Sequence, residues 1–180
     1  FQKISFNPHA SILSGVGFGG GSLVYANTLF HPPDEYFDHD SWKHFANWKQ
    51  ILEPFYRKAA RMMGRIPYDR LHPEDIFLRE VAVEMGRADT FDNVQVGVYL
   101  NGDKEESDPY FGGLGPLRKP CTECAGCMVG CRENAKNSLD RNYLYFAEKM
   151  GLEILTETRA FRIDHVGGEY RVRTMSSTSL

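Results

Sequence analysis

The sequence has no long apolar run and little net charge. Its apolar runs fall well short of the ~18 residues that a membrane-spanning helix needs, so we expect no transmembrane segment. The formal net charge is −3 over 180 residues, which provides no basic field for nucleic acid. The N-terminus has neither an initiator Met nor the charged start and apolar core of a signal peptide. We therefore expect a cytoplasmic protein whose chain begins partway through a longer one.

Cysteine is absent outside one short cluster. Cys121, Cys124, Cys127 and Cys131 follow the spacing C-x2-C-x2-C-x3-C, with which bacterial ferredoxins hold iron and sulfide. Four cysteines this close together could close only tiny loops, so they are poor disulfide partners and indicate metal binding or free thiols in a reducing compartment.

Three interpretations of the cysteine cluster stay open. Four thiols without a metal is the favoured one. An iron–sulfur cluster is the second, although the chain has no further cysteine run and no Pro after Cys131. Zinc is the third, although structural zinc sites usually separate two C-x2-C pairs by a longer spacer. The six histidines include no pair at the H-x-x-x-H spacing, and we assign none of them a catalytic role.

Periodicity and turn residues predict an α+β fold, with helices in the first half and the clearest strands near the end. Helices are expected over residues 41–64, capped by Asp40 or Ser41 and kinked or divided at Pro54, over 72–86 with Pro73 near the start, and over 139–150. Strands are expected over 91–100 and over 152–175, the second folded into a hairpin at Gly167-Gly168. Residues 101–120 are predicted to be loop.

The glycine cluster Gly15–Gly21 is the most informative feature of the first part. It fits G-x-G-x-x-G, but the preceding segment is a poor strand broken by Pro8, so we do not expect a true dinucleotide fingerprint. A flexible glycine loop is one alternative. We favour a phosphate or flavin contact loop, because three consecutive glycines let a ligand approach the backbone. A helix opening at Ser22 would add free N–H groups.

Two segments together resemble the GMC flavoprotein oxidoreductases, near their cholesterol oxidase branch. GVGFGGGSLVYANTLFHPPDEYF, residues 15–37, resembles the family's glycine loop along the flavin. GCRENAKNSLDRNYLYFAEKMGLEILTETRAFRI, residues 130–163, is similar to the family's G-A-K-N-T-L-x-x-N-Y-L-x-x-A-E segment. The two matches occur in the order that the family would give, which makes the pair more specific than either motif alone.

The resemblance implies FAD as the cofactor. Ala160 would lie on the strand near adenine, through its backbone, while the other expected FAD contacts lie in the first segment: Gly19, Gly20, Gly21, Ser22, Tyr25, Ala26 and Asn27. Many cholesterol oxidases have Asn-Gly-Gly in place of the last three residues. The implied reaction oxidises a CH–OH group of a sterol or another bulky apolar alcohol by hydride transfer to flavin N5. Oxygen or another acceptor then reoxidises the flavin.

The same resemblance implies a division of the chain. Residues 1–30 would form the flavin-contacting loop, residues 31–137 a mainly helical substrate cap with the Cys-rich loop 121–131, and residues 138–180 a helix and hairpin of the α/β FAD-binding domain. The family's first nucleotide-binding unit and its catalytic His region have no counterpart here, so we expect an internal fragment that is inactive alone and retains little FAD. The alternative function is an iron–sulfur electron carrier or a zinc-binding module built on the four cysteines.

Overall fold

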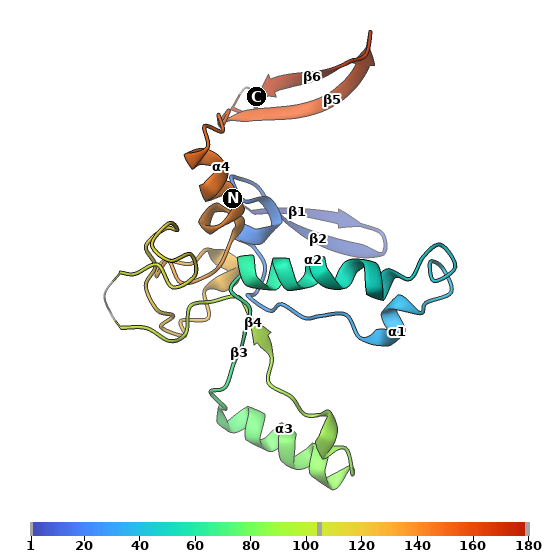
Figure 1. Cartoon of the computed structure of the whole chain (residues 1–180), viewed down its shortest axis with the longest axis vertical. Coiled ribbons are helices and arrows are strands. Elements are labelled where there is room, and N and C mark those ends of the chain that lie inside the picture. The colour runs from blue at the N-terminus through green and yellow to red at the C-terminus, as the bar shows by residue number, and fades with distance from the viewer. Residues whose placement is uncertain (1, 104–105, 179–180) are drawn as a thin grey trace. The chain divides into compact units, whose positions relative to one another are not determined.

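The computed structural model describes residues 2–103 and 106–178, and the chain forms two compact units, Phe1–Phe146 and Ala147–Leu180. Helices and short antiparallel strand pairs alternate in it, which is compatible with the predicted α+β class (Figure 1). The predicted division at residues 30 and 137 stays a prediction. Within the described part of the chain, no helix combines the length and apolar character needed to cross a membrane.

The first unit opens with a β-hairpin that the sequence did not suggest. Strands β1 (Gln2–Asn7) and β2 (Ala10–Gly15) pair antiparallel, with Asn7 opposite Ala10. Pro8 does interrupt the segment, as expected, but it lies in the turn between two strands, where its missing N–H costs no ladder hydrogen bond. The expectation of a poor strand was therefore wrong. The helix expected from Ser22 was also wrong in extent, since only a 3-10 turn, η1 (Gly20–Leu23), forms there.

Helix α2 (Trp48–Met62) follows the short helix α1 (Asp34–Phe37). The prediction placed its start too early, because Asn47 is the cap: its side-chain oxygen accepts the backbone N–H of Gln50 at 3.1 Å. Pro54 lies inside α2 and does not divide it.

Helix α3 (Pro73–Glu84) confirms the helix predicted over 72–86, although His72 is its cap, Pro73 its first residue, and Gly86 lies just beyond its end. Figure 1 shows the chain running out to α3 from β3 (Ile66–Pro67) and back to β4 (Gln95–Val96), which pair antiparallel. A further 3-10 turn, η2 (Ala88–Thr90), follows α3. The strand expected over 91–100 is largely wrong, since only β4 and isolated bridges at Val96 and Val98 form.

The core of the first unit begins at the last residue of β4. Val96, Val98 and Leu100 are buried together, and the side chains of Ile66, Tyr68, Cys121 and Cys127 pack against them. Cys121 and Cys127 are therefore half-buried against this core, whereas Cys124 is exposed. The reactivity of each thiol depends in part on its burial.

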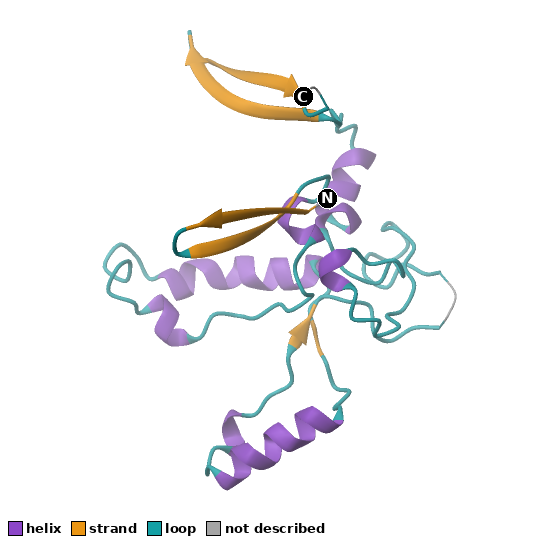
Figure 2. Ribbon diagram, turned by 180° about the vertical axis from the view of Figure 1, so that it is seen from behind, coloured by secondary structure: helices purple, strands orange, loops and turns teal. Residues whose placement is uncertain are grey.

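Residues 97–142 are mostly loop (Figure 2), as predicted for 101–120. Among the described residues of this range, regular structure is limited to the 3-10 turns η3 (Cys127–Val129) and η4 (Leu139–Arg141). The Asp108 carboxylate organises one part of this loop. Oδ1 accepts the backbone N–H groups of Tyr110 and Phe111 at 3.1 and 3.0 Å, and Oδ2 accepts those of Gly113 and Gly115 at 2.8 and 2.9 Å.

Replacing Asp108 by Asn is expected to lower the free energy of unfolding by about 2 kcal/mol at pH 7, because the new amide N–H₂ would face two backbone donors. Burial acts to raise the pKa of Asp108, but the four backbone N–H groups outweigh it and hold the pKa below its usual value. A lowered carboxyl pKa stabilises the fold above the unfolded-state pKa, and this stabilisation is lost as the pH falls through the folded-state pKa. Urea unfolding of both proteins should show the difference shrinking below about pH 4, and a difference that is constant with pH would contradict this role.

The helix predicted over 139–150 is interrupted. The 3-10 turn η4 precedes α4 (Tyr143–Lys149), and Asn142 between them has φ −143° and ψ −99°, outside the helical region. In the second unit, β5 (Thr158–Val166) and β6 (Glu169–Ser176) form the predicted hairpin, with β5 starting later than the expected residue 152. Gly167 and Gly168 have φ values of 63° and 85°, which confirms the predicted turn with positive φ at both positions.

Candidate functional site

The glycine loop is shaped by close backbone approach. A Cβ on Gly15, the last residue of β2, would lie 2.0 Å from the carbonyl oxygen of Gly20, so the strand can meet the loop only without a side chain. Gly20 N–H donates to the Gly17 carbonyl at 3.0 Å and Ser22 N–H to the Gly19 carbonyl at 3.2 Å. These two N–H groups are used inside the loop, which corrects the expectation of free helix N–H groups at Ser22.

Gly21 differs from every other glycine of the chain. The others have a positive φ, a neighbouring atom within 4 Å of a would-be Cβ, or both. Gly21 has an ordinary φ, and a Cβ there would meet no heavy atom of the described residues within 4 Å. Neither backbone conformation nor packing within the described part of the chain requires glycine here, so the open backbone offers a place for a ligand to approach.

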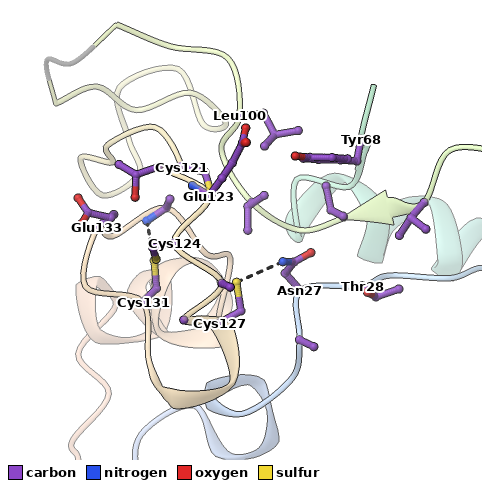
Figure 3. Close-up of a pocket in the computed structure, with 18 of the residues that line it drawn as sticks. Asn27, Thr28, Tyr68, Leu100, Cys121, Glu123, Cys124, Cys127, Cys131 and Glu133 are labelled. Atoms are coloured by element: carbon purple, nitrogen blue, oxygen red, sulfur yellow. Dashed lines mark hydrogen bonds between the residues drawn. The ribbon is translucent and has the colours of Figure 1, made fainter. Parts of the chain in front are cut away.

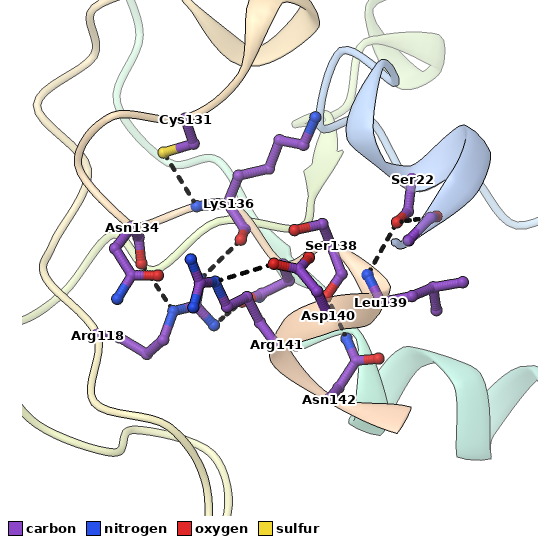
Figure 4. Close-up of polar contacts among 12 residues, drawn as sticks. Ser22, Arg118, Cys131, Asn134, Lys136, Ser138, Leu139, Asp140, Arg141 and Asn142 are labelled. Carbon is purple, nitrogen blue, oxygen red and sulfur yellow. Dashed lines mark hydrogen bonds and ion pairs between the residues drawn. The ribbon is translucent and has the colours of Figure 1, made fainter. Parts of the chain in front are cut away.

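Ser22 joins the two segments that carry the family resemblance. Its Oγ donates to the Gly19 carbonyl at 2.7 Å and accepts the backbone N–H of Leu139 at 2.9 Å (Figure 4). Ser22 and Leu139 are 117 residues apart in sequence. The glycine loop is therefore fixed to the segment that follows the cysteines.

Lys136 makes a second, stronger connection between these segments. Its ammonium group donates to the carbonyl oxygens of Leu23 and Tyr25, each at 2.9 Å, and of Cys127 at 2.7 Å. The side chain is only 3% exposed, and Nζ lies 4.6 Å from the centroid of the Tyr25 ring. All three ammonium protons thus have partners, and the charge is further stabilised by the ring face. Burial lowers the pKa of Lys136, while Cys127 and Cys131 oppose that shift.

Arg118 binds the backbone around Lys136, whose side chain reaches the glycine loop (Figure 4). Its guanidinium donates to the carbonyl oxygens of Asn134 and Lys136 at 2.7 and 2.8 Å and to the side-chain oxygen of Asn137 at 2.6 Å. Asn137 in turn donates to the Met63 carbonyl at 2.9 Å. Arg118 is 1% exposed, and burial lowers its pKa. Residues 134–137 form no helix or strand. The hydrogen bonds from Arg118 therefore hold this segment in place.

Tyr25, Ala26 and Asn27 lie at the end of the glycine segment with different surroundings. The Tyr25 hydroxyl donates to the Asn137 carbonyl at 3.0 Å, and burial raises its pKa, so the phenol stays protonated. Ala26 and Asn27 line a pocket instead (Figure 3). Of these three predicted contacts, the latter two offer groups to a ligand in that pocket.

The pocket has a volume of about 420 Å³, within the range of small-molecule sites. Cys121, Cys124, Cys127 and Cys131 all line it, together with Asn27 and Thr28 (Figure 3). Its apolar lining comes mainly from Val94, Val96, Val98, Leu100 and Ala135, and polar groups at its edge come from Tyr68, His72, Glu123 and Glu133.

Three of the cysteine sulfurs accept N–H hydrogen bonds. Asn27 Nδ2 donates to Cys127 Sγ at 3.2 Å, the Glu123 N–H to Cys121 Sγ at 3.4 Å, and the backbone of residues 135 and 136 to Cys131 Sγ. Burial raises the pKa of Cys121. Among the residues that the structure describes, no group of three or more His, Cys, Asp or Glu side chains is arranged to hold a metal ion, so the iron–sulfur and zinc interpretations gain no support from the geometry.

The predicted cofactor residues fall in both units. Gly19, Gly20, Gly21 and Ser22 form one loop of the first unit, and the chain continues through Tyr25 to Ala26 and Asn27 at the pocket. Ala160 belongs to the second unit, where it pairs with Thr174 in the hairpin next to an irregularity of register. Its role at the adenine end of a flavin stays a prediction.

Sequence reasoning missed Lys136 and Arg118. Lys136 lies within the segment that resembles the GMC family, but no pattern in the sequence shows that its ammonium binds carbonyl oxygens more than 100 residues away. Burial of charged side chains without a charged partner is rare, so nothing in the composition pointed to Arg118.

Comparison with known proteins gives one consistent result. The family profile described as GMC oxidoreductase matches residues 3–174. A cholesterol oxidase of Acinetobacter baumannii is 40% identical, covering 99% of this chain and 34% of that protein. A cholesterol oxidase of Mycobacterium tuberculosis is 41% identical, covering 99% of this chain and 32% of that protein. The chain thus spans about a third of the length of these curated relatives. No solved structure shows a significant match.

Proposed function

The chain belongs to the GMC oxidoreductase family, and on this basis we propose that it forms part of an FAD-dependent enzyme that oxidises the CH–OH group of a bulky apolar alcohol. Relatives about 40% identical bear the name cholesterol oxidase, which favours a sterol as the substrate class and oxygen as one acceptor. The single observation that carries the proposal is the open backbone at Gly21, in a loop of the family's flavin-contact pattern.

The residues present fit a flavin on physical grounds. Gly19 and Gly20 take φ values of 116° and 53°, which glycine adopts without strain, and Gly21 leaves its backbone unobstructed. Ala26 and Asn27 line an adjoining pocket with an apolar floor. When bound, FAD would supply a hydride acceptor at N5.

This chain's own contribution would be binding, orientation and exclusion of water. Ser22 and Lys136 hold the glycine loop in place, so little ordering is left for the moment of binding. The pocket offers apolar surface for the body of the alcohol. The backbone at Ala160 would contact the adenine end of FAD.

Replacing Gly21 by Ala is expected to lower flavin occupancy of the full-length protein at least several-fold while leaving its unfolding transition in place. The added methyl meets nothing in the described chain but would occupy the space that the flavin needs. The ratio of flavin to protein absorbance after purification measures the effect.

Gly86→Ala is the matched control. Gly86 also has no heavy atom within 4 Å of a would-be Cβ, but its φ is +68°, so the variant should lose about 1 kcal/mol of stability and keep its flavin. Full flavin occupancy in Gly21→Ala would remove the main support for the proposal. A brown, iron-containing protein without flavin would instead favour the alternative of an iron–sulfur carrier.

A further inference from the structure

We propose that Cys127 is a positioning residue for the flavin. Its sulfur holds the Asn27 amide so that the amide oxygen, Oδ1, is presented to the pocket as the acceptor for a ring N–H of FAD. This role rests on the proposed function, and it deepens that function by giving one of the four cysteines a task in cofactor binding.

The backbone of Asn27 is held in a fixed conformation. Its φ is +62°, a left-handed conformation that Asn tolerates better than most residues. The Asn27 carbonyl accepts the Gly97 N–H at 2.7 Å, and the next residue, Thr28, forms an antiparallel bridge with Val96. The direction of the chain at Asn27 is therefore set by β4 and the residue that follows it.

The side chain of Asn27 is oriented by Cys127. Asn27 Nδ2 donates to Cys127 Sγ at 3.2 Å. Figure 3 shows the amide nitrogen turned toward this sulfur and the amide oxygen on the other side of the group. Among the described residues, no group donates a hydrogen bond to Oδ1. Because Asn27 lines the pocket, an amide held through its nitrogen leaves a free acceptor there.

Cys127 is itself held firmly enough to act as an anchor. Its side chain packs against the buried core that begins at the end of β4, and its carbonyl accepts the Lys136 ammonium at 2.7 Å. The same ammonium binds the carbonyl of Tyr25 at 2.9 Å, two residues before Asn27. Lys136 therefore fixes the backbone at the start of this short stretch, and Cys127 fixes the side chain at its end.

Left-handed backbone is concentrated around this pocket. Five non-glycine residues of the described chain have positive φ, and three of them line the pocket: Asn27, Glu123 and Ala125. Such conformations are costly and gather at binding sites, where the surrounding contacts hold them. Asn27 combines this conformation with a fixed amide, so little ordering is left for the moment of binding.

A flavin ring suits the free acceptor chemically. Its polar edge carries both N–H and C=O groups, and an amide oxygen can pair with the N–H but not with the C=O. Because the sulfur takes the amide nitrogen, Cys127 decides which amide atom the ligand meets. The lining of the pocket is largely apolar, so a hydrogen bond made there is shielded from water.

A double-mutant cycle on FAD binding tests this role. The apoprotein of the full-length chain is titrated with FAD, and quenching of flavin fluorescence gives the dissociation constant. We expect Asn27→Gly to weaken binding about 10-fold, because the acceptor is lost while glycine suits the positive φ. Cys127→Ala should weaken it about 3-fold, because the amide loses its anchor. The double variant should stay at about 10-fold, because Cys127 acts only through Asn27.

Two further variants separate positioning from packing. Cys127→Ser keeps an acceptor for the Asn27 amide nitrogen and should bind FAD within about 2-fold of the wild type. Val129→Ala is the matched control, because it shortens an exposed side chain of the same 3-10 turn. It should leave the affinity for FAD unchanged.

An equal loss from Cys127→Ala in the wild type and in Asn27→Gly would contradict this role, since additive losses are what a purely structural cysteine gives. Wild-type affinity in either single variant would overturn it as well, because the amide oxygen would then have no partner on the flavin or no need of an anchor. Failure of the proposed function is seen separately, as a wild-type full-length apoprotein that binds no FAD at all.

Discussion

Replacing Arg118 by Met is expected to destabilise the unit Phe1–Phe146 by about 3–5 kcal/mol, enough to unfold a marginally stable domain. Arg118 is 1% exposed and donates to three acceptors within residues 134–137. Met has similar length and fills most of the space, so the loss comes mainly from leaving these acceptors buried without donors, at roughly 1–3 kcal/mol for each. Urea unfolding gives the free energy directly.

Arg132→Met is the matched control for this prediction, since Arg132 is an exposed residue of the same loop region. It should change the free energy of unfolding by less than about 0.5 kcal/mol. Arg118→Lys should fall between the two, because one ammonium cannot reproduce the planar fork of donors. If Arg118→Met unfolds at the same urea concentration as the wild type, the buried hydrogen bonds of Arg118 do not organise residues 134–137.

The elements that the sequence predicted well are those whose signals are local. The limits of α3 follow from Pro73 and Gly86, and the turn of the last hairpin follows from Gly167-Gly168, because each depends on backbone preferences of adjacent residues. The β1–β2 hairpin was missed because Pro8 was weighed only as a strand breaker, although a break between two strands can be the turn that joins them. A helix opening at Ser22 did not form either, since only the 3-10 turn Gly20–Leu23 is present there.

The residues of the candidate site also divide into those that could be predicted from local sequence and those that could not. The glycine loop could be recognised from its residues, because closely spaced glycines have a direct meaning for backbone approach. The cysteine spacing alone suggested a cluster, yet three of the sulfurs accept N–H groups of the protein and line a pocket with apolar residues. The contacts of Lys136 join segments more than 100 residues apart, and those of Arg118 link loop residues 16 to 19 positions apart. Such contacts become visible only when the fold brings those segments together.

Replacing Lys136 by Met is expected to weaken FAD binding by the full-length protein about 10–100-fold and to cost about 2–4 kcal/mol of stability. The Lys136 ammonium holds the carbonyl groups of Leu23 and Tyr25 in the predicted flavin loop and that of Cys127 at the pocket. Met leaves all three carbonyls without a charged donor, so the glycine loop is no longer fixed before the flavin arrives, and binding must supply the cost of ordering it. Quenching of FAD fluorescence on titration into the apoprotein measures the dissociation constant.

Measuring stability and FAD affinity separately distinguishes two roles for Lys136, which are stabilising the unit and positioning the flavin loop. Lys49→Met, at an exposed position paired with Asp34, controls for removal of a positive charge and should leave FAD affinity unchanged. Ser22→Ala tests the second tie of the same loop, since it removes the acceptor of the Leu139 N–H, and should weaken FAD binding less than Lys136→Met because one neutral hydrogen bond is lost in place of three charge-assisted ones. A Lys136→Met protein that unfolds more easily but binds FAD with wild-type affinity would show that Lys136 stabilises the unit without positioning the flavin loop.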